Sequence, residues 1–370
     1  MKITKLLLAA FASSLFLASC SDDDNNGPTP YIPQGEFDSG VLILNQGGFG
    51  HDDASVSYLS ADFSRFENDI FSAANPDVVL GDTAQDICFN GAFAYIILNG
   101  SNKIEVVNRY TMKSITTIET GLSNPRYMAV YNGKGYVTNW GSGVNPTDDY
   151  VAVINLSTDV VTGAIPVVEG PERIIEAGGK LYVAQTGGYG YGNQISVINP
   201  ANNAVSTILV GDVPNAMQEK DGFLWVSCGG KPSFAPAETS GGLVKINLAT
   251  NTVANSYFYS NEVGAVKKHP ANLVINGTSA FYTIDSGVYK FDLSAAAIPA
   301  TPAFTTVDQG DYGVYSFAIK GYHIYVGDAG DYIHNGHVYL YSLGAGGQSL
   351  GTLEETYQVG VIPAGFYFNY

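Results

Sequence analysis

Cysteine is scarce in this sequence, and the few cysteines are far apart. The 370-residue chain has only Cys20, Cys88 and Cys228. So few cysteines exclude a disulfide-stapled scaffold, and no Cys/His spacing is typical of a zinc site. We therefore assign no metal ligand. We predict that Cys88 and Cys228 are unpaired structural residues in separate repeats.

Basic residues are also few. Lys and Arg together number 17 against 34 Asp and Glu, which gives a net charge of −17. Cleavage of residues 1–19 as a signal peptide would remove Lys2 and Lys5 and no acidic residue, so the net charge would become −19. A surface this negative repels phosphate backbones, which argues against a nucleic-acid partner.

The N-terminal apolar run is too short to cross a bilayer. It extends from Leu6 to Ala18 and follows Lys2 and Lys5, an order typical of a signal peptide. The run ends in Leu-Ala-Ser before Cys20, which resembles the lipobox of bacterial lipoproteins. We predict that residues 1–19 are a lipoprotein signal peptide and that Cys20 is lipidated. The alternative is an ordinary secretory signal with a chance cysteine.

A short acidic segment follows Cys20. Residues 21–26 read Ser-Asp-Asp-Asp-Asn-Asn, and Gly and Pro come next. Such a composition buries too little apolar surface to order itself, so we predict a flexible tether over residues 20–39. The acidic stretch resembles a signal that exports lipoproteins to the outer leaflet of the outer membrane. We therefore predict a lipid-anchored, surface-exposed protein; a periplasm-facing location and a merely solubilising linker are the alternatives.

Sustained helical periodicity is absent after the tether, and a sequence repeat of four predicted strands occurs instead. Each unit opens with a short apolar segment, often at a proline, as at Pro125, Pro171, Pro214 and Pro270. The spacings between these prolines, 46, 43 and 56 residues, fit four short strands with their turns, the size of one propeller blade. This four-strand repeat occurs seven times.

The order of the strands predicts how the ring closes. The first unit begins at its second strand, Val41–Asn45, and the chain ends with an unpartnered first strand, Pro363–Phe368. This last strand would complete the first blade and protect its edge. We therefore predict an all-β, seven-bladed β-propeller of four-stranded blades over residues 40–370. A pair of β-sandwiches is the runner-up.

Long loops rich in glycine and aromatic residues are expected on one face of this propeller. In each blade the loop between the second and third strands shares a face with the connection to the next blade. Glycine allows close backbone approach, and aromatic side chains give a large rigid contact area. We predict ligand binding on this face and at the channel mouth, by Phe49, His51, Arg126, Tyr127, Trp140, Glu172, Arg173, Tyr189, Tyr191, Asn215, Phe234, Asn272, Tyr315, Tyr332 and His334.

Signals for catalysis are weak. His334 and His337 lack a third ligand, and the sequence has no nucleophile elbow, phosphate-binding loop or His-Glu-x-x-His motif. Glu172 and Arg173 near Arg126 could form an acid–base cluster or an ion-pair network. We assign no catalytic residue and no cofactor.

Four segments carry a resemblance to a known family. Residues 42–47 (Leu-Ile-Leu-Asn-Gln-Gly), 124–127 (Asn-Pro-Arg-Tyr), 329–332 (Ala-Gly-Asp-Tyr) and 359–366 resemble YncE-like propeller lipoproteins, and more narrowly the BtuG-type lipoproteins. This resemblance implies capture of cobalamin, as a ligand rather than a cofactor, and its delivery to a TonB-dependent outer-membrane transporter. The alternatives are a lactonase-like or quinone-dehydrogenase-like enzyme, or a carbohydrate- or protein-binding module.

Overall fold

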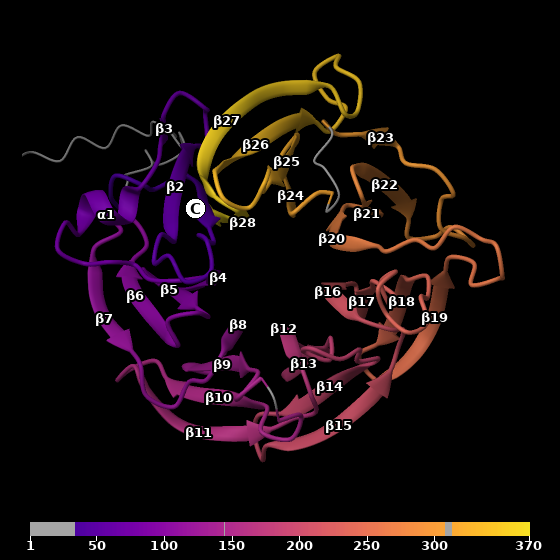
Figure 1. Ribbon diagram of the computed structural model, residues 1–370, viewed down its shortest axis with the longest axis horizontal. Helices are drawn as coiled ribbons and strands as arrows, with labels where there is room; N and C mark the ends of the chain where they lie inside the picture. The colour runs from indigo at the N-terminus through magenta and orange to yellow at the C-terminus, as the bar shows by residue number, and fades with distance from the viewer. Residues whose placement is uncertain (1–33, 144, 308–312) are drawn as a thin grey trace, which may run out of the picture. The chain divides into compact units, whose positions relative to one another are not determined.

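The computed structural model describes residues 34–143, 145–307 and 313–370. The predicted signal peptide, Cys20 and all of the tether before Gln34 lie outside the described residues. Residues 34–370 form one compact unit. Seven four-stranded antiparallel sheets are arranged in a ring in this unit, so the predicted seven-bladed propeller is confirmed (Figure 1).

The blades follow one another along the chain. In the lists below, the strand given first in each blade is the innermost one. Blade 1 consists of β28 (Pro363–Asn369), β1 (Gly40–Asn45), β2 (Ser55–Ser60) and β3 (Phe66–Glu67). Blades 2 to 4 are β4 (Ala84–Asn90), β5 (Phe93–Leu98), β6 (Lys103–Asn108), β7 (Ser114–Ile118); β8 (Pro125–Tyr131), β9 (Lys134–Asn139), β10 (Tyr150–Asn155), β11 (Val160–Pro166); and β12 (Pro171–Ala177), β13 (Lys180–Gln185), β14 (Gln194–Asn199), β15 (Ala204–Leu209). Blades 5 to 7 are β16 (Pro214–Lys220), β17 (Phe223–Cys228), β18 (Gly242–Asn247), β19 (Thr252–Phe258); β20 (Ala271–Asn276), β21 (Ser279–Ile284), β22 (Gly287–Asp292), β23 (Phe304–Thr305); and β24 (Ser316–Lys320), β25 (His323–Asp328), β26 (Asn335–Ser342), β27 (Leu353–Val361).

Burial follows the position of a strand in its blade. The second strands are buried on both faces because neighbouring blades pack on both sides, and β1 is buried at every residue. The fourth strand β15 is exposed except at Ile208, because it lies at the outer rim. The core is therefore a series of apolar layers between adjacent blades.

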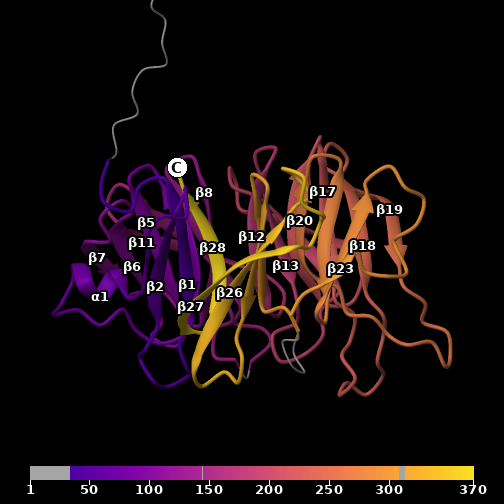
Figure 2. The ribbon, with the colours of Figure 1, turned by 90° about the horizontal axis from the view of Figure 1, so that it is seen from above.

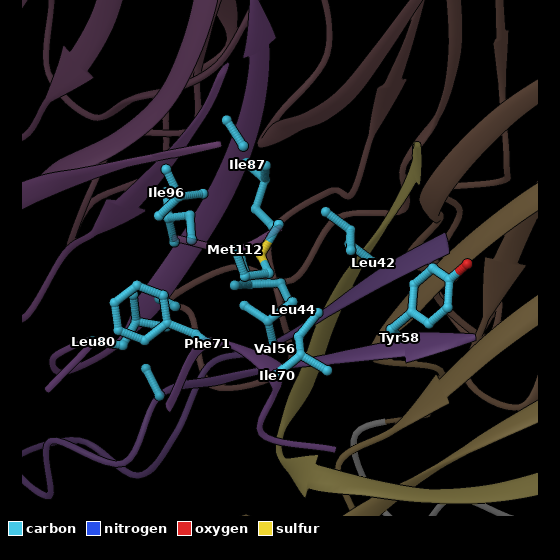
Figure 3. Close-up of a cluster of buried hydrophobic side chains, with 14 of the residues drawn as sticks. Leu42, Leu44, Val56, Tyr58, Ile70, Phe71, Leu80, Ile87, Ile96 and Met112 are labelled. Atoms are coloured by element: carbon cyan, nitrogen blue, oxygen red, sulfur yellow. The ribbon is translucent and has the colours of Figure 1, made fainter. Parts of the chain in front are cut away.

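One such layer joins blades 1 and 2. Leu42 and Val56 from blade 1 pack in one cluster with Ile87 and Ile96 from blade 2 (Figure 3). A helix that the sequence did not predict, α1 (Ile70–Ala74), adds Ile70 and Phe71 to the same layer. Full burial of each such side chain stabilises the fold by about 1.5–3 kcal/mol.

The ring closes where the two ends of the described chain meet. β28 pairs antiparallel with β1 from Gly40 opposite Asn369 to Asn45 opposite Pro363, as predicted. The side-chain amide of Asn369, which is fully buried, donates to the Phe37 carbonyl at 2.7 Å and to the Arg109 carbonyl at 2.8 Å. The first bond attaches the last strand to the segment that leads into β1, and the second attaches it to the turn between β6 and β7 of blade 2.

The two faces of the ring differ. We call the face with the first-to-second strand turns, such as that between β8 and β9, the turn face, and the opposite one the loop face. The C-terminus and the start of the described chain both lie on the turn face, where the Ser39 amide donates to the Asn369 carbonyl at 2.8 Å (Figure 2). The described chain therefore enters the propeller on the side opposite its long loops.

The described residues contain no helix that is long and apolar enough to cross a membrane. Cys88 and Cys228 are free thiols, in β4 and β17, and Cys228 is fully buried. Burial raises the pKa of the Cys228 thiol to about 12, so it is a packing residue at neutral pH.

Candidate functional site

An ion pair lies at the loop-face end of the central channel. Arg126 and Glu172 are the second residues of neighbouring inner strands, β8 and β12, so their side chains meet at the same height. The guanidinium donates to both carboxylate oxygens, at 2.9 and 2.8 Å. The side chains are only 15% and 13% exposed. Burial opposes the charge on Arg126, but Glu172 outweighs it and raises the pKa of Arg126.

Trp140 supports this ion pair from the side. The Arg126 guanidinium lies over the indole, 4.3 Å from the ring centroid, and the indole N–H donates to the Pro171 carbonyl at 3.1 Å. Of the two roles that the sequence left open for Arg126 and Glu172, the structure therefore has the ion pair.

Tyr315 reaches the same level from the opposite part of the ring. Its hydroxyl donates to Gln46 at 2.6 Å, and its ring meets that of Tyr332 edge-on at 5.7 Å. Burial raises the pKa of Tyr315, and both Arg126 and Glu172 are near enough to act on it electrostatically. We call Arg126, Glu172, Tyr315 and Gln46 the mouth layer.

A cavity of about 580 Å³ lies in the channel beyond the mouth layer. Tyr127 and Arg173 line it near the mouth layer, and Lys320 and Phe368 line it near the turn face. The Arg173 guanidinium lies 4.0 Å from the centroid of the Tyr127 ring. We call this space the channel cavity.

Asn215 and Asn272 also line the channel cavity, but their amide N–H groups are used between blades. Asn215 donates to the Pro270 carbonyl at 2.8 Å, and Asn272 donates to the Val314 carbonyl at 3.0 Å. Each bond links an inner strand to the start of the next blade. Their first role is therefore to hold the ring together.

A smaller pocket opens among the loops of blades 3 and 4. Its volume is about 250 Å³, and Trp140, Asp149, Glu169 and Tyr189 line it. Tyr189 is 82% exposed and contacts the Trp140 ring edge-on at 5.9 Å. Asp149 is only 4% exposed and accepts a hydrogen bond from the Gly170 amide; burial raises its pKa to about 6. We call this the aromatic pocket.

The other predicted residues are not brought together. Phe49 and Phe234 are 81% and 84% exposed, on loops of blades 1 and 5. His334 is exposed and pairs with Asp331 in its own loop. His51 and Tyr191 are exposed, and neither lines the aromatic pocket or the channel cavity. Within the described part of the chain, no group of three or more His, Cys, Asp or Glu side chains could hold a metal ion.

The site residues predicted from the sequence leave out several side chains of these sites. Asp149 and Glu169 form the acidic side of the aromatic pocket, Lys320 lines the channel cavity, and the Tyr367 hydroxyl donates to Asp86 in the lining of that cavity. Asp149 directly precedes the third strand of its blade, and Tyr367 lies in the inner strand β28. Their places in the repeat could have indicated that both lie near the channel or the loop face.

Comparison with known proteins gives a family and a fold. Residues 39–327 match the model of a family described as a domain of unknown function, DUF5074. No curated protein matches the chain in sequence.

Three solved structures are similar in fold. Apo AztD from Citrobacter koseri is 10% identical with a TM-score of 0.54, over 88% of this chain and 96% of that chain. Hydrazine synthase from Kuenenia stuttgartiensis is 17% identical with a TM-score of 0.57, over 74% and 86%. The dihydro-heme d1 dehydrogenase NirN is 12% identical with a TM-score of 0.52, over 89% and 78%. At such identities the likeness shows the fold alone.

Proposed function

The chain belongs to the DUF5074 family, whose description names no activity, and from its site we propose that it is a non-enzymatic protein that captures a small molecule on its loop face. The observation that carries this proposal is the aromatic pocket. Trp140 and the exposed Tyr189 stand beside the mouth layer there, on the face opposite the start of the described chain. An exposed aromatic ring beside polar groups is the usual composition of a ligand-binding surface.

The state of the charged groups favours binding over catalysis. Glu172, the strongest sequence candidate for an acid or base, has both carboxylate oxygens on Arg126. His334 is held by Asp331 in an exposed loop. A general base needs access to the proton it removes, and an ion-paired carboxylate at the mouth layer is poorly suited to that role.

We propose a corrinoid such as cobalamin as the ligand, on the resemblance to YncE-like and BtuG-type lipoproteins. A corrinoid is wide and flat, so it would cover the aromatic pocket rather than enter its 250 Å³. Tyr189 would stack on it, and its amide groups would donate to Glu169 and accept hydrogen bonds from loop N–H groups.

We also propose that Cys20 is lipidated, that the protein is anchored at the cell surface, and that it delivers the ligand to a TonB-dependent transporter. The described chain begins at Gln34 on the turn face, which would leave the loop face directed away from the anchor. A tether from residue 20 to residue 34 spans at most about 50 Å when extended. That reach would allow the propeller to turn its loop face onto a transporter in the same membrane.

Calorimetric titration with cyanocobalamin tests the ligand, and a pair of tyrosine variants tests the face. Tyr189→Ala on the loop face should weaken binding at least about tenfold, since loss of one stacked ring removes about 1.4 kcal/mol or more. Tyr322→Ala is the matched control, because Tyr322 is 69% exposed on the turn face. No heat with the parent protein would exclude the corrinoid, and equal effects of the two variants would exclude the loop face as its site.

A further inference from the structure

Arg173 has an unusual position for an arginine in so acidic a chain. It is the third residue of β12 and lines the channel cavity, where its guanidinium stacks on Tyr127. Among the residues that the structure describes, no carboxylate forms an ion pair with it and its guanidinium makes no hydrogen bond. By contrast, the neighbouring Arg126 is fully paired with Glu172.

The Asp86 carboxyl group does not compensate this charge by contact. Asp86, on β4, accepts hydrogen bonds from the Met128 amide at 3.1 Å and from the Tyr367 hydroxyl at 3.0 Å. Each of its oxygens therefore already accepts one hydrogen bond, and burial raises its pKa. Asp86 acts on Arg173 through space only.

The charged groups that face the cavity leave an excess of positive charge. Arg173 and Lys320 are cations, Asp86 is the acid, and Arg126 and Glu172 neutralise each other at the mouth layer. Tyr127 and Tyr367 also face Arg173, and burial raises the pKa of both, so they are neutral. A guanidinium stacked on a ring keeps its in-plane N–H donors free, in the fork that matches a carboxylate.

The remainder of the cavity wall is mixed. Polar groups come from Asn215, Gln218 and Asn272, and the apolar residues of the lining include Ile174, Met217, Leu273, Phe317 and Phe366. A volume of about 580 Å³ lies within the range of small-molecule sites. The cavity therefore combines a planar cation that has no ion pair with a wall of both polar and apolar groups.

We propose that the channel cavity binds a small organic carboxylate, whose carboxylate group is held by Arg173 and whose body lies against the inner strands. This site goes beyond the proposed capture on the loop face, because it lies on the other side of the mouth layer and takes a different class of ligand. Lys320, exposed at the turn-face end of the lining, marks the side from which such an anion enters.

Thermal unfolding and calorimetry of the mature chain, with no corrinoid present, test the proposal with benzoate as the probe. Saturating benzoate should raise the unfolding midpoint by about 2 °C or more, and the neutral isostere benzamide should not. Arg173→Gln should abolish the benzoate effect, and Arg173→Lys, which keeps the charge but loses the fork, should weaken it about tenfold. Arg65→Gln is the control, because Arg65 lies in blade 1 and pairs with Glu36 and Glu67.

A second measurement on the unaltered protein guards against a variant that fails to fold. Benzoate should protect Arg173 from modification by phenylglyoxal, as read by peptide mass, and should not protect Arg65. Equal shifts with benzoate and benzamide, unprotected Arg173, or a response to inorganic phosphate alone would each overturn the proposal. None of these results depends on cobalamin, so the two proposals fail separately.

Discussion

The replacement Glu172→Gln separates a structural role of the mouth layer from a catalytic one. The side chain keeps its shape but loses its charge, so Arg126 keeps its stacking on Trp140 and loses its ionic partner. A buried cation without a counter-charge is costly, and breaking a buried pair typically destabilises a protein by about 3–5 kcal/mol. Because the two side chains retain 15% and 13% exposure, we expect the lower end, about 3 kcal/mol.

A double-mutant cycle shows whether this loss belongs to the pair. Arg126→Met alone leaves Glu172 unpaired and should destabilise as well, whereas the double variant has no unpaired charge. We therefore expect the double variant to be more stable than the sum of the single losses implies, with a coupling of about 1.5–3 kcal/mol. The Thr138 hydroxyl donates to the Glu172 backbone carbonyl and is unaffected by either change.

Urea unfolding, followed by circular dichroism and by tryptophan fluorescence, measures these differences. The fluorescence of the two tryptophans reports on different regions, because Trp140 contacts Arg126 and Trp225 is buried between blades 5 and 6. Additive losses, or a Glu172→Gln variant within about 0.5 kcal/mol of the parent, would refute the ion-pair role. A stable Glu172→Gln protein that loses a measurable hydrolase activity would support the enzyme alternative instead.

Three further changes test ring closure, loop packing and pH dependence. Asn369→Ala leaves two buried carbonyls without donors and should cost about 2–4 kcal/mol in urea unfolding; a loss below about 1 kcal/mol would contradict its closing role. Gly170→Ala should greatly lower the thermal midpoint, because φ is +68° and the new Cβ would lie 1.8 Å from the Gly188 nitrogen. The control Gly163→Ala meets open space and should be nearly neutral. The Asp149 carboxyl, with a pKa of about 6, keeps its proton in the fold after the unfolded chain has lost it, so its contribution to stability falls as pH rises from about 4 to 6. Asp149→Asn should flatten that part of the profile and be more stable than the parent at pH 7 to 8, and an unchanged slope would contradict this.

The fold was predictable because the repeat carries it. Pro125, Pro171 and Pro214, which marked the repeat in the sequence, are the first residues of β8, β12 and β16. Proline is tolerated at the first position of a strand, and there it marks the turn from the outer strand of one blade to the inner strand of the next. The helix α1 was not predictable by periodicity, because five residues do not complete two turns.

The partners of the site residues were only partly predictable. Arg126 and Glu172 are 46 residues apart, which is one repeat, so equal positions in adjacent blades could suggest their contact. The bonds of Asn215 and Asn272 to backbone carbonyls could not be predicted, because every residue has a backbone carbonyl and the residue type does not indicate which one accepts. Several loop glycines also serve the loop itself: a Cβ at Gly192 would lie 1.9 Å from the Gln185 carbonyl oxygen.

The mouth layer lies between the two proposed sites, so substitutions on either side of it should affect the two binding reactions separately. The aromatic pocket lies outside it, where Trp140 stacks on Arg126, and Arg173 lies inside it, one residue after Glu172. Tyr189→Ala should therefore affect only the outer site and Arg173→Gln only the inner one. Glu172→Gln frees the charge of Arg126 between them, so it should alter both binding reactions together with stability. If Glu172→Gln changes binding at one site and leaves binding at the other unchanged, the mouth layer does not contribute to both sites.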